Sequence, residues 1–456
     1  MNGLAANARP GLARLGAIAL AAIVLLAACS GATSTPSAAP SAAAASAAAP
    51  TATAATPLVV GVLAPFTGPD AALGPAYFAA CLPAVREINA AGGVMGHQLT
   101  CKQFDTRGDP ADAVPAARQM VASTPNLMMV IGCTSDEASS VAPVLEQNHI
   151  VSFCMTGQSE FNKSSFHYFH RLVPPDEYDA YAMVGSALDF NHYQRVALVF
   201  GNDIGSQAFV APATRALTKL GATVVINQAI ALGQPSYRTE VTKMLAAKPD
   251  VIFTEALGPT DATYLAEVKQ LNGSMIPVIG TSATIDPVWF KAVSAAIGLP
   301  DLLKYFQAVD VSTTFSGPGY DAFKAALLAS AADFADAPKY AQRGATLHLY
   351  DGVVMTALAM DTAKSTDPAV YNPVINKIGN GVTGATVVNT YKQGVDALKA
   401  GGSVRFSGAA GLTQFNEWNN SQGGYILVKY DDKGGEVTIG QLTQDQTNQI
   451  IQAGGS

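Results

Sequence analysis

Apolar and polar residues alternate with two different periods along most of this chain. Short runs rich in valine, isoleucine and leucine are followed by longer segments whose apolar residues recur at helical spacing. The short runs are typical of buried strands, and the longer segments are typical of amphipathic helices. Their repeated succession predicts parallel sheets that are covered by helices on both faces. The predicted strands cover residues 58–65, 98–105, 127–133, 150–156, 195–201, 222–228, 250–256 and 276–280.

The glycine-rich segment REINAAGGVMGHQL, residues 86–99, raises the question of a phosphate-binding loop. A loop of that kind needs a strand before its glycines and a helix after them. Here a helical pattern precedes the glycines and an alternating strand pattern follows them. We therefore expect Gly92 and Gly93 to end a helix in the left-handed conformation, and Gly96 to lie in the turn before the next strand.

The order of elements predicts an α/β fold with two doubly wound parallel-sheet lobes and several crossovers between them. A chain of 456 residues exceeds one ordinary core. The alternation breaks at Pro174 and Pro175, the chain is mainly helical from Tyr320 to about Ala400, and the end is a predicted hairpin. We expect lobe 1 to span 58–173 with completion by 312–404. Lobe 2 is expected to span 174–311 with completion by 405–456.

The first residues have the pattern of an export signal. A basic start and a short apolar stretch precede residues 26–29, LAAC, which resemble the cleavage box of a bacterial lipoprotein. The resemblance implies a signal peptide over 1–28 and a lipid-bearing Cys29; ordinary signal cleavage is the alternative. Residues 29–57 are small and uncharged, so we expect a disordered tether that holds the folded part at the membrane.

The net charge and the absence of enzyme motifs limit the classes of function that the sequence favours. The net charge is −7, which does not favour nucleic acid or an anionic membrane surface as a partner. The chain has no Gly-x-Ser-x-Gly, His-Glu-x-x-His or Walker motif, and only His167 and His170 lie close in sequence. We therefore predict a monomeric small-molecule-binding protein, and we expect neither catalysis nor a metal or other cofactor.

Cysteine positions favour two disulfides in an exported chain. Cys81 lies on the first predicted helix, and Cys101 lies on the strand after it. Cys133 and Cys154 each end an apolar strand, and these two strands are expected to be neighbours in a parallel sheet. We favour the pairs 81–101 and 133–154, with free buried thiols as the alternative.

Ligands of open parallel sheets bind at the carboxyl ends of the strands. Hydroxyl and N–H groups at helix starts suit an anion or a carbonyl, whereas carboxylates suit an ammonium or a hydroxyl. Helix capping is the alternative for the hydroxyls and acids, and a core position is the alternative for the tyrosine. The candidate ligand-binding residues are Phe66, Thr134, Ser135, Asp136, Thr156, Gly157, Gln158, Asp203, Glu255, Ser282 and Tyr350.

Several segments in order resemble the solute-binding proteins of the branched-chain amino acid transport family. The resemblance rests on VGVLAPFTGPDAALGPA, VREINAAGGVMGHQL, DTRGDPADAV, VIGCTSDEASSVAPVLE and YDGVVMTALAM. It implies a type I periplasmic binding protein, with two lobes joined by three strands that close on a small molecule. It also implies an ABC permease and ATPase as partners. A sensor of the same fold that reports to a signalling receptor is the alternative.

Only some of the family's ligand-binding residues have a matching residue in this chain. The family's hydroxyl and backbone groups for a ligand carboxylate fall on residues 134–136 and 156–158, and its wall tyrosine falls on Tyr350. Its acid for the ligand ammonium falls near Ser282, so only Glu255 or Asp203 remains to replace it. We therefore expect weak binding of leucine, isoleucine and valine, and better binding of a neutral polar ligand or a simple carboxylic acid. The family's three cleft aromatics are replaced by Leu73, Ile204 and Leu257.

Overall fold

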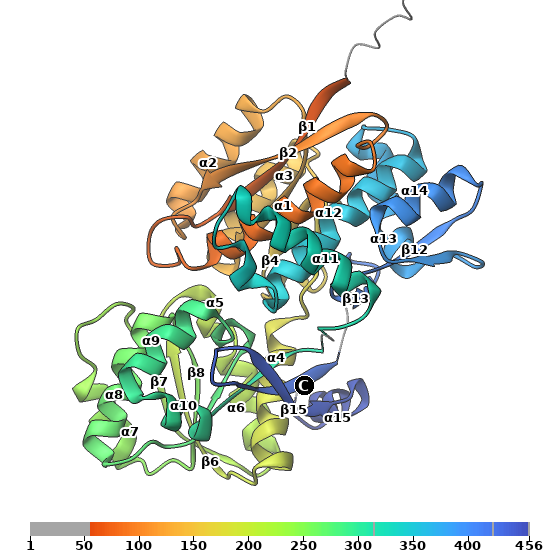
Figure 1. The fold of residues 1–456 in the computed structure, drawn as a ribbon. Coiled ribbons are helices and arrows are strands. Elements are labelled where there is room, and N and C mark those ends of the chain that lie inside the picture. Colours follow the sequence, from red (N-terminus) through yellow and green to blue (C-terminus); the bar gives the residue numbers. More distant parts are fainter. Residues whose placement is uncertain (1–54, 313–314, 422–423, 455–456) are drawn as a thin grey trace, which may run out of the picture. The chain divides into compact units, whose positions relative to one another are not determined.

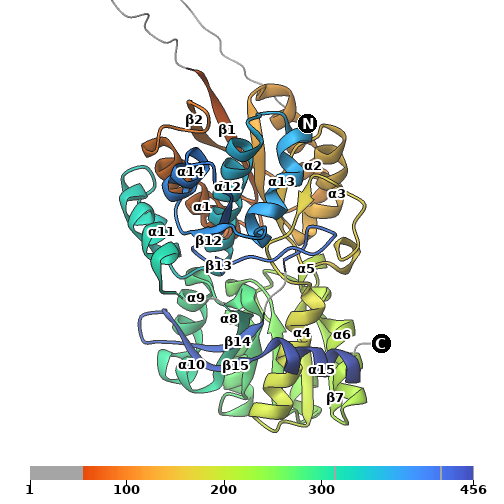
Figure 2. The ribbon, with the colours of Figure 1, turned by 90° about the vertical axis from the view of Figure 1, so that its right-hand side faces the viewer.

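The computed structural model describes residues 55–312, 315–421 and 424–454 (Figure 1). The predicted signal peptide, Cys29 and the tether up to residue 54 lie outside these residues. The described residues form an α/β fold with two lobes, each built on its own sheet. Figure 2 shows the two lobes from the side, with residues 425–454 of the second lobe in dark blue.

The first lobe contains a parallel sheet in the order β2-β1-β3-β4-β5. Helices α1 and α12 pack on one face, and α2 and α3 pack on the other. The strand β1 starts before residue 58, so the last residues of the predicted tether belong to the sheet. The elements are β1 (Ala55–Ala64), α1 (Leu73–Ala90), β2 (His97–Asp105), α2 (Pro110–Ser123), β3 (Leu127–Thr134), α3 (Ser135–Gln147), β4 (Ser152–Met155) and β5 (Phe169–His170).

The second lobe contains a mixed sheet in the order β15-β14-β10-β9-β8-β6-β7. Its strands are parallel from β10 to β7, and β14 and β15 pair antiparallel at the other edge. Two apolar clusters cover its faces. The elements are α4 (Asp176–Gly185), β6 (Arg195–Gly201), α5 (Ile204–Gln207), α6 (Val210–Lys219), β7 (Thr223–Ile230), α7 (Arg238–Ala246), β8 (Val251–Glu255), α8 (Gly258–Asn272), β9 (Val278–Gly280), α9 (Pro287–Ile297), α10 (Leu299–Tyr305), β10 (Phe306–Val311), β14 (Tyr425–Tyr430), β15 (Glu436–Leu442) and α15 (Gln444–Gly454).

The later part of the chain returns to the first lobe and adds helices and a small sheet. The elements are α11 (Pro318–Ala329), α12 (Gly344–Ala363), α13 (Pro368–Asn380), β11 (Thr386–Val388), α14 (Tyr391–Lys399), β12 (Val404–Gly408) and β13 (Gly411–Leu412). The predicted boundary at residue 405 is wrong. Phe406 and Phe415 pack into the core of the first lobe, and the Ser421 N–H donates to the Arg171 carbonyl at 2.8 Å. The chain enters the second lobe only at β14.

Short helical turns connect several of these elements. They are η1 (Ser159–Phe161), η2 (Ser186–Phe190), η3 (Ser282–Thr284), η4 (Ser330–Ala332) and η5 (Ala337–Tyr340). The chain passes between the lobes after β5, after β10 and after β13. These passages let the lobes move as separate bodies while they stay connected.

The glycines of residues 86–99 have the predicted structural role. Gly92 and Gly93 follow α1 with φ of 103° and 78°, and Gly96 has φ of 86° in the turn before β2. All three adopt the left-handed region that favours glycine. The prediction of a helix end and a turn is confirmed.

Candidate ligand-binding site

A cavity of about 490 Å³ lies at the carboxyl ends of the strands, and both lobes contribute to its wall. We call it the interlobe cavity. The first lobe contributes residues before α1, after β3 and β4, and at the start of α12. The second lobe contributes the start of α4 and residues after β6, β8 and β9. The carboxyl ends of the two sheets are therefore the edges that form it, as parallel-sheet topology predicts.

Seven of the eleven candidate residues line the interlobe cavity. They are Thr134, Ser135, Asp136, Gly157, Asp203, Glu255 and Ser282. The other four lie elsewhere. Among the positions of the family's cleft aromatics, Leu73 and Leu257 line the cavity, but Ile204 is exposed instead. Sequence reasoning missed the aromatic side chains that do line it, which are Tyr77, Phe209 and Trp289.

Tyr350 does not form a cavity wall, so this prediction is wrong. The residue lies well inside α12, is fully buried, and donates its hydroxyl to the Glu87 carboxylate on α1. Burial raises the pKa of Tyr350 well above its usual value. Arg343 and His348 line the cavity instead, because they lie at and just inside the amino end of α12. The alternative of a core tyrosine holds.

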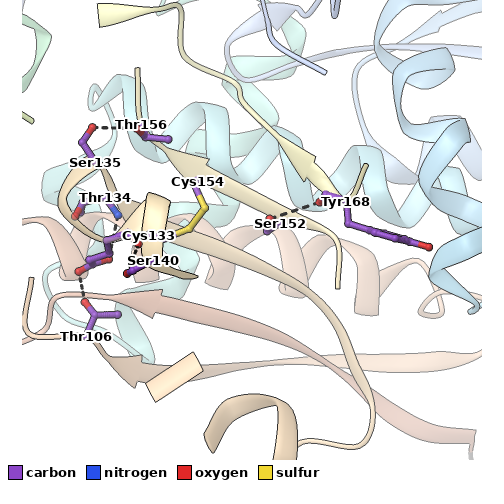
Figure 3. Close-up of a disulfide and its surroundings, with 10 residues drawn as sticks. Thr106, Cys133, Thr134, Ser135, Ser140, Ser152, Cys154, Thr156 and Tyr168 are labelled. Carbon is purple, nitrogen blue, oxygen red and sulfur yellow. Dashed lines mark hydrogen bonds between the residues drawn. A yellow bond between two sulfur atoms is a disulfide. The ribbon is translucent and has the colours of Figure 1, made fainter. Parts of the chain in front are cut away.

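Phe66, Thr156 and Gln158 support the wall without lining it. Phe66 packs edge-on against Phe78, with ring centroids 6.5 Å apart. Thr156 is buried and accepts a hydrogen bond from the Ser135 hydroxyl at 3.2 Å (Figure 3). The Gln158 carbonyl accepts from the buried Arg171 guanidinium at 3.1 Å, next to the first passage between the lobes.

Both cysteine pairs favoured by the sequence are disulfides. Cys81 on α1 is bonded to Cys101 on β2, with Cα atoms 6.1 Å apart. Cys133 on β3 is bonded to Cys154 on β4, with Cα atoms 4.8 Å apart (Figure 3). The second bond ties together the two strand ends that lead into the cavity wall, so it fixes their separation.

One acidic group lies at the amino end of α3, and we call Asp70, Asp136 and Asp203 the α3-side acids. Asp136 in the first turn of α3 accepts from the Gly205 N–H of the second lobe at 3.0 Å. Asp70 is hydrogen-bonded to Asp136. Burial, followed by the charges of Asp136 and Asp203, raises the pKa of Asp70 to about 8. Asp70 therefore keeps its proton near neutral pH.

A second acidic group lies at the amino end of α4, and we call Asp176, Asp179 and Glu255 the α4-side acids. Asp179 accepts from the Ser282 hydroxyl at 3.1 Å, and burial raises the pKa of Asp179 to about 6. Burial, together with neighbouring acids, also raises the pKa of Glu255 and of Asp176 well above their usual values. Glu255 accepts from the Thr281 hydroxyl.

Gly157 is needed where Asp176 approaches the first lobe. A Cβ atom at Gly157 would overlap the carboxylate of Asp176. The Asp176 N–H also donates to the Gly157 carbonyl at 2.7 Å. The absence of a side chain at Gly157 thus lets the start of α4 sit against the end of β4.

Arg343 joins the two lobes on the other side of the cavity. It precedes α12 of the first lobe and donates to the carbonyls of Ser282, at 3.0 Å, and of Ile285 in the second lobe. Its Nε lies 3.8 Å from the Asp286 carboxylate. Asp310 also lines the cavity here, and burial raises its pKa to about 7 despite the opposing effect of Arg343.

His348 presents unused hydrogen-bonding groups to the cavity. Its side chain is 9% exposed, and neither ring nitrogen has a hydrogen-bond partner among the described residues. Burial lowers the pKa of His348 to about 4, so the ring is neutral near pH 7. A neutral imidazole can donate one hydrogen bond and accept one.

The acidity of the cavity is the largest departure from the sequence-based expectation. We expected Glu255 or Asp203 as the only substitutes for a missing acid, whereas the wall contains further carboxylates that sequence reasoning missed. These are Asp70, Asp176, Asp179, Asp286 and Asp310. The sequence could have indicated two of them, Asp176 and Asp179, because they closely follow the predicted crossover at residues 174–175.

The same cavity argues against the expected simple carboxylic acid as ligand. A carboxylate ligand would lie beside the acids at the amino ends of both α3 and α4, and would raise their pKa values further. In the described part of the chain, no group of three or more His, Cys, Asp or Glu side chains is arranged to hold a metal ion. Over the same residues, no helix is long and apolar enough to cross a membrane.

Comparison with known proteins agrees with this architecture. The family model described as "Periplasmic binding protein" matches residues 57–434. The Leu/Ile/Val-binding protein BraC3 of Rhizobium johnstonii is 27% identical over 316 residues, which cover 68% of this chain and 81% of that protein. An amino acid binding protein of Pseudomonas aeruginosa is 23% identical, with coverage of 68% and 80%.

Two solved structures show the same fold. The leucine binding protein LivK of Thermotoga maritima superposes with a TM-score of 0.68 at 16% identity, and the match covers 85% of this chain and 99% of that one. A solute binding protein of R. palustris in complex with benzoate has a TM-score of 0.65 at 16% identity, with coverage of 86% and 98%. The chain belongs to the periplasmic binding protein family.

Proposed function

We propose that this protein is an extracytoplasmic lipoprotein that captures a small molecule between its two closing lobes. It then delivers this solute, as a monomer, to the permease and ATPase of an ABC importer. The observation that supports the proposal is the interlobe cavity, whose wall comes from both lobes at the carboxyl ends of their strands. A solute that contacts both lobes binds the closed arrangement better than the open one, and so shifts the population towards closure.

Direct contacts between the lobes are of the kind that can form and break during such a movement. On one side Asp136 accepts from the Gly205 N–H, and on the other side Arg343 donates to two carbonyls of the second lobe. These are polar contacts of only two side chains. A bound solute adds contacts to both lobes, which makes closure depend on the solute.

Small-angle scattering and thermal unfolding test this function together. A cognate solute is expected to raise the melting temperature with concentration and to reduce the radius of gyration. Arg343→Ala removes the interlobe hydrogen bonds to the Ser282 and Ile285 carbonyls and is expected to enlarge the radius of the solute-free protein. Arg215→Ala, at an exposed position of α6, is the matched control. A tightly bound solute that leaves the radius unchanged would contradict capture by closure.

The lipid anchor is tested separately. If Cys29 carries the lipid, Cys29→Ser should abolish partitioning of the protein into the detergent phase. Cys81 and Cys101 form a disulfide, so the double variant Cys81→Ser/Cys101→Ser controls for loss of cysteine elsewhere. Unchanged partitioning of Cys29→Ser would rule out anchoring through this residue.

A further inference from the structure

The interlobe cavity concentrates acidic side chains. Among the described residues of its wall, eight are carboxylates and Arg343 is the only cationic side chain. The whole chain has 34 acids and 27 bases, so the cavity departs strongly from the average. The carboxylates are Asp70, Asp136, Asp176, Asp179, Asp203, Glu255, Asp286 and Asp310.

Unpaired acceptors in this wall point independently to a ligand with hydrogen-bond donors. The Asp286 side chain is 5% exposed, and its Oδ2 atom makes no hydrogen bond among the described residues but lies 3.8 Å from the Arg343 Nε. Both nitrogens of His348 are also without partners there, and its neutral ring offers one acceptor. A buried acceptor without a donor is costly.

Apolar side chains occupy the wall between the acids. Leu73 and Met155 contribute from the first lobe, and Leu257 and Val311 contribute from the second. The aromatic rings of Tyr77, Phe209 and Trp289 also reach the wall. Such a surface favours methylene groups, and aromatic rings additionally favour cations. The cavity wall thus combines two acidic groups with apolar side chains from both lobes.

We propose that the solute is an aliphatic amine, and that a diamine with its ammonium groups held by the α3-side acids and the α4-side acids fits best. This proposal rests on the proposed function, because it identifies the solute class of the same cavity. Each ammonium group would form charge-assisted hydrogen bonds to carboxylates, and the methylene chain would contact the apolar wall. The ligand cations would also relieve the repulsion among the acids.

Other ligand classes fit this wall less well. The amino end of α3, where an anion would otherwise bind, is occupied by the Asp136 carboxylate with Asp70 beside it. A zwitterion such as leucine would place its own carboxylate among these acids. A metal ion lacks a suitable group of three ligands among the described residues. An organic cation meets none of these obstacles.

Binding of an amine should release protons. Burial raises the pKa of Asp70 to about 8, of Asp310 to about 7 and of Asp179 to about 6, and repulsion by neighbouring acids adds to the shifts of Asp70 and Asp310. A neighbouring ammonium lowers these pKa values, so the affinity should increase as the pH rises from 6 to 8. The charged or titratable groups that face these acids are Asp136, Asp176, Asp203, Glu255, Asp286, Arg343, His348 and, next to Asp310, Glu436.

A series of equally long probes separates charge from size. Calorimetry would compare pentane-1,5-diamine, pentan-1-amine, pentane-1,5-diol and pentanoate, with leucine as the zwitterion. We expect affinity to fall in the order diamine, monoamine, diol, with the diamine about 100-fold tighter than pentanoate or leucine. Titration of the diamine in phosphate and in Tris should give different heats, because protons are released to the buffer.

Variants of the two acidic groups test the assignment within the cavity. Asp70→Asn and Asp179→Asn are nearly isosteric and should each weaken diamine binding by about 10- to 100-fold. Their effect on the diol should be much smaller, which a general loss of structure would not produce. Asp432→Asn, at an exposed turn outside the cavity, is the matched control and should bind the diamine normally.

The outcomes distinguish this proposal from the proposed function. Tight binding of leucine or pentanoate with a reduced radius of gyration would overturn the amine assignment and leave the solute-binding function intact. Failure of both amines to bind at 10 mM would also overturn the amine assignment. Amine binding that leaves the radius unchanged would support the solute class and contradict capture by closure.

Discussion

Buried carboxylates occur in two settings in this protein, the lobe interiors and the interlobe cavity. In the interiors they are paired with donors. Asp351 accepts from the N–H groups of Ala409 and Ala410 at 2.7 and 2.9 Å. Asp261 accepts from the Thr254 hydroxyl at 3.0 Å and from the Trp289 indole at 2.8 Å. These acids hold elements together.

In the cavity, carboxylates also accept hydrogen bonds, but in addition they face one another. Asp70 and Asp136 are hydrogen-bonded to each other, and Glu255 is repelled by Asp203 and the acids of α4. The same side-chain type thus stabilises the fold in one setting and weakens the solute-free fold in the other. Perturbed acids in a cleft are typical of functional sites, where stability is lower than packing alone would allow.

The largest expected effect comes from removing an acid that is paired in a lobe interior. Asp351→Ala leaves the N–H groups of Ala409 and Ala410 unpaired and should lower the free energy of unfolding by about 4 kcal/mol. Denaturant unfolding measures this change, and Asp432→Ala is the exposed control. A loss below about 1 kcal/mol would mean that the interior acids are no better paired than those of the cavity.

Removal of the Cys133–Cys154 disulfide should have the next largest effect on stability. Cys133→Ala/Cys154→Ala opens a loop with a sequence separation of 21 residues and should cost about 3 kcal/mol of stability. Because the bond fixes the ends of β3 and β4, solute affinity should fall as well. The double variant of Cys81 and Cys101 should lose similar stability while solute binding is retained. Equal loss of solute binding in both double variants would contradict a specific role of the Cys133–Cys154 disulfide in solute binding.

Removing an acid from the cavity should raise the free energy of unfolding, whereas removing Asp351 should lower it. Asp70→Asn should raise the free energy of unfolding of the solute-free protein by about 1 kcal/mol at pH 7.5. The raised pKa of Asp70, about 8, means that the folded state binds its proton more tightly than the unfolded state. The stability that this proton provides is fully present below about pH 4 and is lost as the pH rises towards 8.

The advantage of Asp70→Asn over the unaltered protein should therefore grow between pH 5 and pH 8. Thermal unfolding at several pH values measures it. An advantage that is constant or shrinks over this range would remove the basis for distinguishing cavity acids from interior acids.

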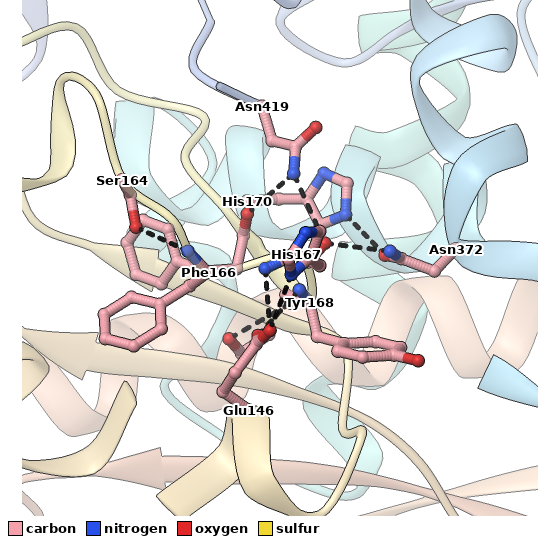
Figure 4. Close-up of polar contacts among 10 residues, drawn as sticks. Glu146, Ser164, Phe166, His167, Tyr168, His170, Asn372 and Asn419 are labelled. Atoms are coloured by element: carbon pink, nitrogen blue, oxygen red, sulfur yellow. Dashed lines mark hydrogen bonds and ion pairs between the residues drawn. The ribbon is translucent and has the colours of Figure 1, made fainter. Parts of the chain in front are cut away.

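An exposed ion pair provides the smallest expected effect. His167 is 84% exposed and its Nδ1 lies 3.1 Å from Glu146, whose carboxylate also accepts the N–H groups of His167 and Tyr168 (Figure 4). His167→Ala removes the ring contact and keeps the N–H contacts, so stability should change by less than about 0.5 kcal/mol. A loss above about 1.5 kcal/mol would show that exposed acids also matter to the fold.

Local patterns in the sequence determined much of the fold. The strand predicted over residues 195–201 has the same bounds as β6, and the glycines after α1 have the predicted conformations. The two disulfide pairs also followed from neighbouring elements. These features depend on residues that are close in sequence or on adjacent parallel strands, so periodicity and turn chemistry are sufficient to predict them.

The tertiary structure alone decided which side chains meet in the cavity. Tyr350 and His348 are two residues apart on α12, yet one lies in the core beside Glu87 and the other lines the cavity. Asp70 and Asp179 belong to different lobes, and each looks like an ordinary loop or helix-start acid in the sequence. Their burial in one cavity depends on how the chain passes between the lobes, and local periodicity contains no information on contacts so distant in sequence.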